Sequence, residues 1–210
     1  IAILFISACG DSASESAEQV AEVPSEDVAP REIPEYTIED FMANSRYTGA
    51  SWSPSGSNIL VSHNRSGIFN AYALKANGRE EVPLTFSTSD AIFAVSYFNE
   101  AERFIYRADQ GGNELAHLYV KELDGTVIDI TPGENLVASF NGWADDYQTF
   151  YVQTNERDQR YFDIYQYQVA EGYPRELVYE NNDNFFPGNI SNNGRYLTLI
   201  EVLTTSNTNI

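Results

Sequence analysis

The chain has 210 residues, of which 42% are hydrophobic, and its 31 acidic and 12 basic residues give a net charge of −19. This length and apolar content are sufficient for one folded domain with a core. The charge excludes a nucleic-acid partner, because such binding needs clustered Lys and Arg to neutralise phosphates. We interpret the acidity as a well-solvated surface rather than as a binding function.

The first eight residues are interpreted as the remnant of a signal peptide. Residues 1–6 are apolar, and the small residues Ser7 and Ala8 precede Cys9, the single cysteine of the chain. This layout is typical of a secretory signal that ends at a small-residue cleavage site. With a cysteine directly after the cleavage site, the segment resembles a bacterial lipobox. This resemblance implies that the Cys9 thiol is lipidated.

We therefore expect an exported protein that is lipid-anchored in the bacterial cell envelope, on the periplasmic face of the inner or outer membrane. The alternative is a cytosolic protein whose apolar start packs into its own core. Residues 9–35 are rich in Ser, Ala, Glu and Pro and poor in large apolar residues, which predicts a disordered acidic tether. Beyond it, Thr37 with Asp40 three residues later predicts a helix start with a capping box.

The remainder, residues 36–210, is built from a repeat. Each copy has a turn, such as the segment from Ser53 to Gly56, followed by a short apolar strand and then by a polar-aliphatic-Tyr triplet. The tyrosines Tyr72, Tyr119 and Tyr165 recur at a spacing of roughly 46 residues, and we interpret them as repeat core. A further strand closes each copy, and the strand that leads into the turn brings the number to four.

A period in the mid-forties with four short strands per unit is typical of β-propeller blades. No window shows the sustained apolar period of 3.6 that a helical solenoid would need. We predict an all-β propeller of about three and a half four-stranded blades, at roughly residues 49–95, 96–141, 142–188 and, incompletely, 189–210. Because this number of blades leaves the ring incomplete, we expect the sequence to be a fragment of a longer protein.

Several motifs carry a family resemblance. The segment from Trp52 to Gly56 and the pair Leu84-Thr85 are similar to the Trp-Ser-Pro-Asp-Gly and Leu-Thr pattern of TolB-like proteins and of the N-terminal domains of prolyl oligopeptidase family (S9) serine peptidases. The segment from Arg107 to Glu114, running into His117-Leu118-Tyr119, resembles the Asp-x-Gly-Gly-Asn-Glu…His-Leu-Tyr pattern of those peptidase propellers. Ser55 stands where the family has Asp, and the later copies lose the Trp-Ser-Pro.

The resemblance implies that chemistry lies in an α/β-hydrolase domain after the propeller, which would gate the access of short peptides to it. No Gly-x-Ser-x-Gly elbow occurs in this chain, so we assign it no catalytic, cofactor-binding or metal-binding residue. The alternative is a non-enzymatic TolB-like lipoprotein that binds protein partners in the envelope. A propeller glycosidase or lyase is disfavoured, because no acidic pair can be assigned acid and base roles.

The two histidines are expected to be structural. His63 and His117 lie in different blades with no nucleophile identifiable beside either, and His117 occupies the position that Asn70 and Asp163 hold in the other copies. A polar role within each blade explains that position better than catalysis does.

The other oxygen-rich segments are also interpreted as loops. Glu114 ends a Gly-rich stretch that we expect to form a tight loop between strands rather than a substrate contact. Asp145-Asp146 and residues 180–184 could offer oxygen ligands to calcium, but their spacing matches no EF-hand loop. We interpret both segments as solvated turns.

Overall fold

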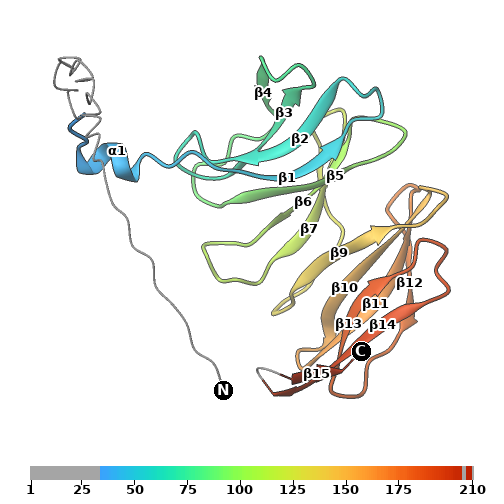
Figure 1. The fold of residues 1–210 in the computed structure, drawn as a ribbon. Coiled ribbons are helices and arrows are strands. Elements are labelled where there is room, and N and C mark those ends of the chain that lie inside the picture. The colour runs from blue at the N-terminus through green and yellow to red at the C-terminus, as the bar shows by residue number, and fades with distance from the viewer. Residues whose placement is uncertain (1–33, 205–206, 210) are drawn as a thin grey trace, which may run out of the picture. The chain divides into compact units, whose positions relative to one another are not determined.

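A computed structural model describes residues 34–204 and 207–209 (Figure 1). It divides into two units, which meet in the sequence between Ala43 and Asn44. The predicted signal remnant, Cys9 and nearly all of the predicted tether lie outside the described residues. Within those residues, no helix has the length and apolar character needed to cross a membrane.

The first unit contains the short helix α1 (Ile38–Met42). The hydroxyl of Thr37 accepts a hydrogen bond from the Asp40 amide at 3.2 Å, and the Asp40 carboxylate accepts one from the Thr37 amide at 2.8 Å. The predicted capping box is therefore confirmed. These hydrogen bonds lower the pKa of Asp40, because they favour its ionised form.

The second unit consists of four antiparallel sheets that follow one another along the chain (Figure 1). The first and second sheets contain, in order, β1 (Tyr47–Trp52), β2 (Asn58–His63), β3 (Asn70–Lys75) and β4 (Glu81–Pro83), and β5 (Ile92–Tyr97), β6 (Phe104–Ala108), β7 (His117–Lys121) and β8 (Val127–Asp129). The third sheet contains β9 (Ala138–Trp143), β10 (Thr149–Asp158), β11 (Tyr161–Gln168) and β12 (Arg175–Tyr179). The fourth contains β13 (Phe185–Ile190), β14 (Leu197–Thr204) and β15 (Asn207–Asn209). Strands pair in chain order within each sheet. The predicted all-β propeller architecture is confirmed.

The sheets begin before the repeat boundaries that the turn motifs suggest. The boundaries expected near residues 95, 141 and 188 fall inside β5, β9 and β13. The reason is that each marker turn joins the first strand of a sheet to the second. A blade therefore starts one strand ahead of its most recognisable motif.

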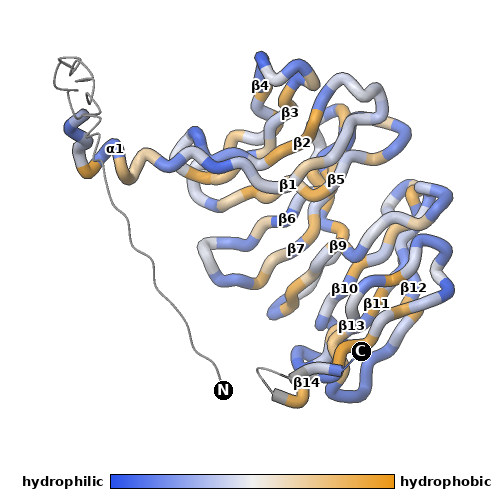
Figure 2. Tube along the Cα trace, viewed as in Figure 1, coloured by the Kyte–Doolittle hydropathy of each residue, from blue (hydrophilic) through white to orange (hydrophobic). Residues whose placement is uncertain are grey.

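Burial depends on the position of a strand within its sheet. The inner strand β10 is buried from Thr149 to Asn155 without the alternation of a half-exposed strand. The outer strands β4 and β12 are largely exposed, and β8 is mostly half-buried. Blades pack both faces against their neighbours, so the middle strands need apolar residues on both sides. Figure 2 shows a hydrophobic stretch along β2, in the middle of its sheet.

The repeated triplets contribute to the core chiefly through their aliphatic residues. Ala71, Leu118 and Ile164 are completely buried. Tyr72 is also buried, but the equivalent tyrosines at positions 119 and 165 are half-buried and pack against the margins of the core. The interpretation of the tyrosines as repeat core is therefore confirmed for Tyr72, and the other two pack against the core without being fully buried. The Arg175 guanidinium lies over the ring of Tyr165, 5.0 Å from its centroid.

Side chains on the first strands join neighbouring blades. The Ser51 hydroxyl in β1 accepts a hydrogen bond from the Tyr97 amide in β5 at 3.0 Å. Asn141 in β9 accepts one from the Ile190 amide in β13 at 3.0 Å. Each first strand carries a register shift, and such bulges re-aim side chains toward a neighbour.

Candidate functional site

Three polar residues occupy one repeat position at or near the start of the third strand of their sheets: Asn70 in β3, His117 in β7 and Asp163 in β11. Asn70 Oδ1 accepts hydrogen bonds from the Thr85 hydroxyl at 2.9 Å and the Ser87 amide at 2.7 Å. In all three sheets, this residue bonds the end of the fourth strand or the segment that follows it. The residue at this position therefore links the third strand of each of these sheets to the end of the fourth strand or to the residues just beyond it.

Asp163 has the densest polar contacts of the three. Its fully buried carboxylate accepts hydrogen bonds from Arg157 Nε at 2.8 Å, from Arg157 Nη2 at 2.9 Å and from the Asn181 amide at 2.8 Å. The hydrogen bond to Asp163 raises the pKa of Arg157. A bidentate pair of this kind fixes both side chains in one geometry, so this cluster is a structural joint.

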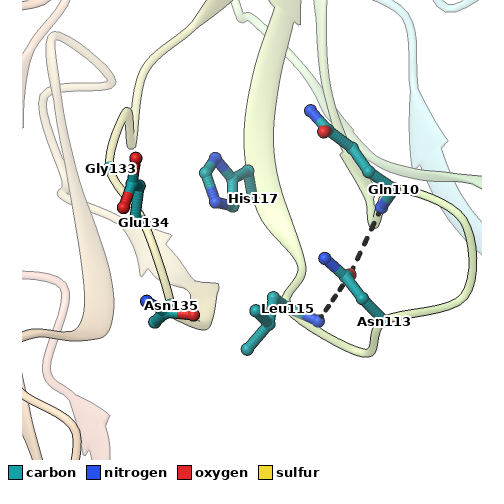
Figure 3. Close-up of a pocket in the computed structure, with 7 residues that line it drawn as sticks. All are labelled: Gln110, Asn113, Leu115, His117, Gly133, Glu134 and Asn135. Carbon is teal, nitrogen blue, oxygen red and sulfur yellow. Dashed lines mark hydrogen bonds between the residues drawn. The ribbon is translucent and has the colours of Figure 1, made fainter.

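A pocket of about 260 Å³ lies beside His117 (Figure 3). Its lining consists of Gln110, Asn113, Leu115, His117, Gly133, Glu134 and Asn135. Figure 3 shows the His117 imidazole facing Gly133 and Glu134 across the pocket, and its Nδ1 lies 2.8 Å from Asp129 Oδ2, which fixes the orientation of the ring. The lining offers imidazole, amide and carboxylate groups but no serine, threonine, cysteine or lysine. The pocket can therefore hold a polar ligand by hydrogen bonds, and it carries no nucleophile.

The loop on one side of this pocket is the predicted tight loop. Asn113 Oδ1 accepts a hydrogen bond from the Leu115 amide at 3.0 Å, and the Glu114 amide donates to Asp109 Oδ2 at 3.0 Å. Glu114 has a φ of 62°, a left-handed conformation that is uncommon outside glycine and is maintained here by these side-chain caps. The prediction of a tight loop is confirmed, and the Glu114 side chain is exposed.

The oxygen-rich segments are held in turns. Asp146 Oδ1 accepts hydrogen bonds from the Gln148 amide at 2.9 Å and the Thr149 amide at 3.0 Å. Asn181 is buried, and its side chain donates to the Phe185 carbonyl at 2.7 Å. Over residues 34–204 and 207–209, no group of three or more His, Cys, Asp or Glu side chains is arranged to hold a metal ion.

His63 has a neighbour that the sequence did not suggest. Its Nδ1 lies 3.0 Å from Glu81 Oε1, and its Nε2 lies 2.5 Å from the Ser45 hydroxyl. A serine hydroxyl that could not be identified from the sequence therefore lies beside this histidine. Tyr47 pairs with His63 across β1 and β2, which brings Ser45, two residues earlier, to the far nitrogen of the ring. The repeat predicted from the sequence begins at Gly49 and therefore excludes Ser45. The proximity of Ser45 to His63 becomes apparent only from the pairing of β1 with β2.

Comparison with known proteins places this geometry in a family. The family model described as "Dipeptidyl peptidase IV (DPP IV) N-terminal region" matches residues 76–206, more than half of the chain. Dipeptidyl aminopeptidase BIII of Pseudoxanthomonas mexicana is 28% identical over 128 residues, which cover 60% of this chain and 18% of that relative. The chain thus spans less than a fifth of the length of the curated relative that it matches.

Solved structures share the fold. TolB from Acinetobacter baumannii superposes with a TM-score of 0.56 at 15% identity, covering 78% of this chain and 40% of that one. Prolyl oligopeptidase B from Galerina marginata superposes with a TM-score of 0.56 at 11% identity, covering 74% and 24%. The resemblance to S9 propellers inferred from the motifs is confirmed, and the chain belongs to the family of dipeptidyl peptidase IV N-terminal regions, as an S9-type N-terminal propeller domain.

Proposed function

We propose that the whole protein is a serine peptidase of the prolyl oligopeptidase family that hydrolyses short peptides, and that this chain supplies its propeller. The observation that carries the proposal is the family match over residues 76–206. The chain contains no Gly-x-Ser-x-Gly elbow, so in this proposal peptide cleavage belongs to an α/β-hydrolase domain elsewhere in the protein.

In this proposal the propeller restricts which peptides reach the catalytic serine. The pocket beside His117 supports a role in contacting peptides, since imidazole, amide and carboxylate groups can pair with the donors and acceptors of a peptide backbone. A small opening admits short or unfolded chains and excludes folded ones, because a folded substrate cannot present an extended backbone without first unfolding.

The test is an assay of the full-length protein on peptides of increasing length. We expect hydrolysis of di- to oligopeptide substrates, inactivation by a serine-directed phosphonate, and resistance of a folded protein that contains the same cleavable sequence. Cleavage of the folded protein at a rate similar to that of the free peptide would remove the gating role while leaving the peptidase assignment in place.

A non-enzymatic TolB-like propeller is the alternative outcome of the same experiment. The likeness to TolB supports the shared fold, and the match to the peptidase family favours the enzyme. A full-length protein that lacks a serine elbow and shows no peptide hydrolysis would establish a binding protein instead, and the search should then turn to envelope partners.

We further propose that acyl chains on Cys9 anchor the protein in the bacterial cell envelope. Replacing Cys9 by Ala removes the thiol that would be acylated, so we expect the protein to move from the membrane fraction to the soluble fraction. Each buried methylene contributes about 0.8 kcal/mol, and more than one chain is needed for stable anchoring. Ser12→Ala, which leaves the thiol in place, is the matched control. Unchanged membrane association of Cys9→Ala would exclude the lipid anchor.

A further inference from the structure

We propose that Ser45 is an activated nucleophile that accepts an acyl group from activated esters, with His63 as its general base. A serine within hydrogen-bond reach of an imidazole, which is oriented in turn by a carboxylate, is the arrangement that activates hydroxyl nucleophiles in proteins. Here Ser45 Oγ lies 2.5 Å from His63 Nε2, and His63 Nδ1 lies 3.0 Å from Glu81 Oε1. This site is separate from the peptidase chemistry proposed above.

The imidazole is fixed on every side. The ring of Tyr47 stacks on it with a centroid distance of 4.0 Å and an interplanar angle of 15°, and Tyr72 meets it edge-on at 5.8 Å. His63 is 2% exposed. A ring held in this way keeps Nε2 directed at Ser45 without the loss of entropy that a mobile base would suffer on aligning.

Glu81 orients the imidazole. Its side chain is 5% exposed, and its second oxygen lies 2.7 Å from the guanidinium of Arg65. A buried carboxylate at Nδ1 selects the tautomer in which Nε2 accepts the serine proton, and it stabilises the imidazolium that then forms. Glu81 is therefore a positioning residue, and the contact with Arg65 holds its carboxylate in place.

Ser45 is held rigidly and remains accessible. The Asn64 side chain accepts a hydrogen bond from the Arg46 amide at 2.7 Å and donates one to the Asn44 carbonyl at 3.0 Å, so both neighbours of Ser45 are fixed by the same amide. Ser45 itself is exposed. An ester in solution can therefore reach the exposed serine, while the base that activates the serine stays buried and fixed.

The reaction balances with these groups alone. Ser45 Oγ attacks the carbonyl carbon of the ester as its proton passes to His63 Nε2, and the new Oγ–C bond forms. The bond to the leaving group then breaks, and His63 returns the proton to the departing oxygen. The products are acyl-Ser45 and a free alcohol or phenol. Water activated by the same imidazole can later release the acyl group as a carboxylic acid.

The test treats the folded full-length protein with an alkyl fluorophosphonate, a phosphonyl analogue of an activated ester from which fluoride departs. Digestion and mass spectrometry then measure labelling of the peptide that contains Ser45. We expect labelling of Ser45 in the wild type, none in Ser45→Ala, and a rate at least about a hundredfold lower in His63→Gln. Ser55→Ala, which removes an exposed serine from a turn of the same blade, should leave the labelling unchanged.

Glu81→Gln separates a positioning role from a packing role. The loss of the carboxylate removes the stabilisation of the imidazolium, so the pH at which labelling rises should move downward while the maximal rate falls. The aromatic neighbours Tyr47 and Tyr72 and the cation of Arg65 remain in all of these variants. Near-ultraviolet circular dichroism reports whether each variant retains its fold.

Absence of label on Ser45 in the folded wild type would overturn the proposal, as would labelling no faster than that of Ser55. In that case the contacts of Ser45 serve only to fasten the chain to the first blade. A label on a serine outside this chain bears on the peptidase assignment alone, because peptide mapping distinguishes the two sites.

Discussion

Raising the pH is expected to unfold the propeller cooperatively between about pH 10 and about pH 12. Burial raises the pKa of Tyr97, Tyr106 and Tyr167 from 10.0 to about 12 in each case. In the unfolded chain these phenols release their protons near pH 10, whereas the folded protein retains them until about pH 12. Ionisation therefore stabilises the unfolded state over this window, and the stability of the folded state falls as the pH rises.

The loss of stability on ionisation of these tyrosines is large enough to unfold the protein. A difference of one between the folded and unfolded pKa values corresponds to about 1.4 kcal/mol, so ionisation of the three tyrosines removes several kcal/mol of stability. The total stability of a typical domain is about 5–15 kcal/mol. Below pH 10 the phenols are protonated in both states, so the contribution is fully present there and is lost only above it.

The measurement follows tyrosinate absorbance and far-ultraviolet circular dichroism in the same pH titration. We expect ionisation of the buried tyrosines to coincide with the loss of sheet structure. Tyr97→Phe removes one buried phenol and should move the midpoint to higher pH, whereas Tyr196→Phe, at a site that is 69% exposed, is the matched control. Complete tyrosine ionisation with an intact sheet spectrum would contradict the burial argument.

Much of the fold could be predicted because the turns and strands of each repeat are determined by residues that are close together in the sequence. The turn from Ser53 to Gly56 is followed by apolar residues that form β2, and the triplet beginning at Asn70 forms the start of β3. These signals depend on neighbours within a few residues of one another. The first strand of each blade is harder to place, because its bulge interrupts the alternation of side chains.

The sites could not be predicted to the same extent, because they depend on the exact register of strand pairing and on the path of the loops. His117 could be assigned a structural role by comparing repeat positions. The contact between Ser45 and His63 depends on the register of β1 against β2, and the pocket at His117 depends on where the loop at Glu134 crosses it. A one-residue change of register would turn these side chains to the opposite face of the sheet.

Asp163→Ala is expected to destabilise the protein by about 1–3 kcal/mol, because it removes the acceptor of a buried backbone amide, while the Arg157 side chain, 30% exposed, can still reach water. The carboxylate is fully buried and bonds Arg157 and the amide of Asn181. Without it, that amide is left buried and unsatisfied. Urea denaturation of the variant and the wild type measures the loss.

Asp158→Ala is the matched control on the same hairpin. Asp158 pairs with Arg160 at 2.7 Å in a solvent-accessible setting, where ion pairs contribute little to stability. A variant of Asp158 as destabilised as Asp163→Ala would show that loss of any charge on this hairpin matters, independent of burial.

The loss at Asp163 should also be localised. Asn181 lies in the segment between β12 and β13, and its side chain bonds the carbonyl of Phe185 at the start of the fourth sheet. Hydrogen exchange of the Asp163→Ala variant should therefore accelerate first at Asn181 and along β13, while the middle of β10 keeps its protection until global unfolding. Uniform acceleration through both strands would mean that Asp163 stabilises the unit as a whole and does not act as the joint between its third and fourth blades.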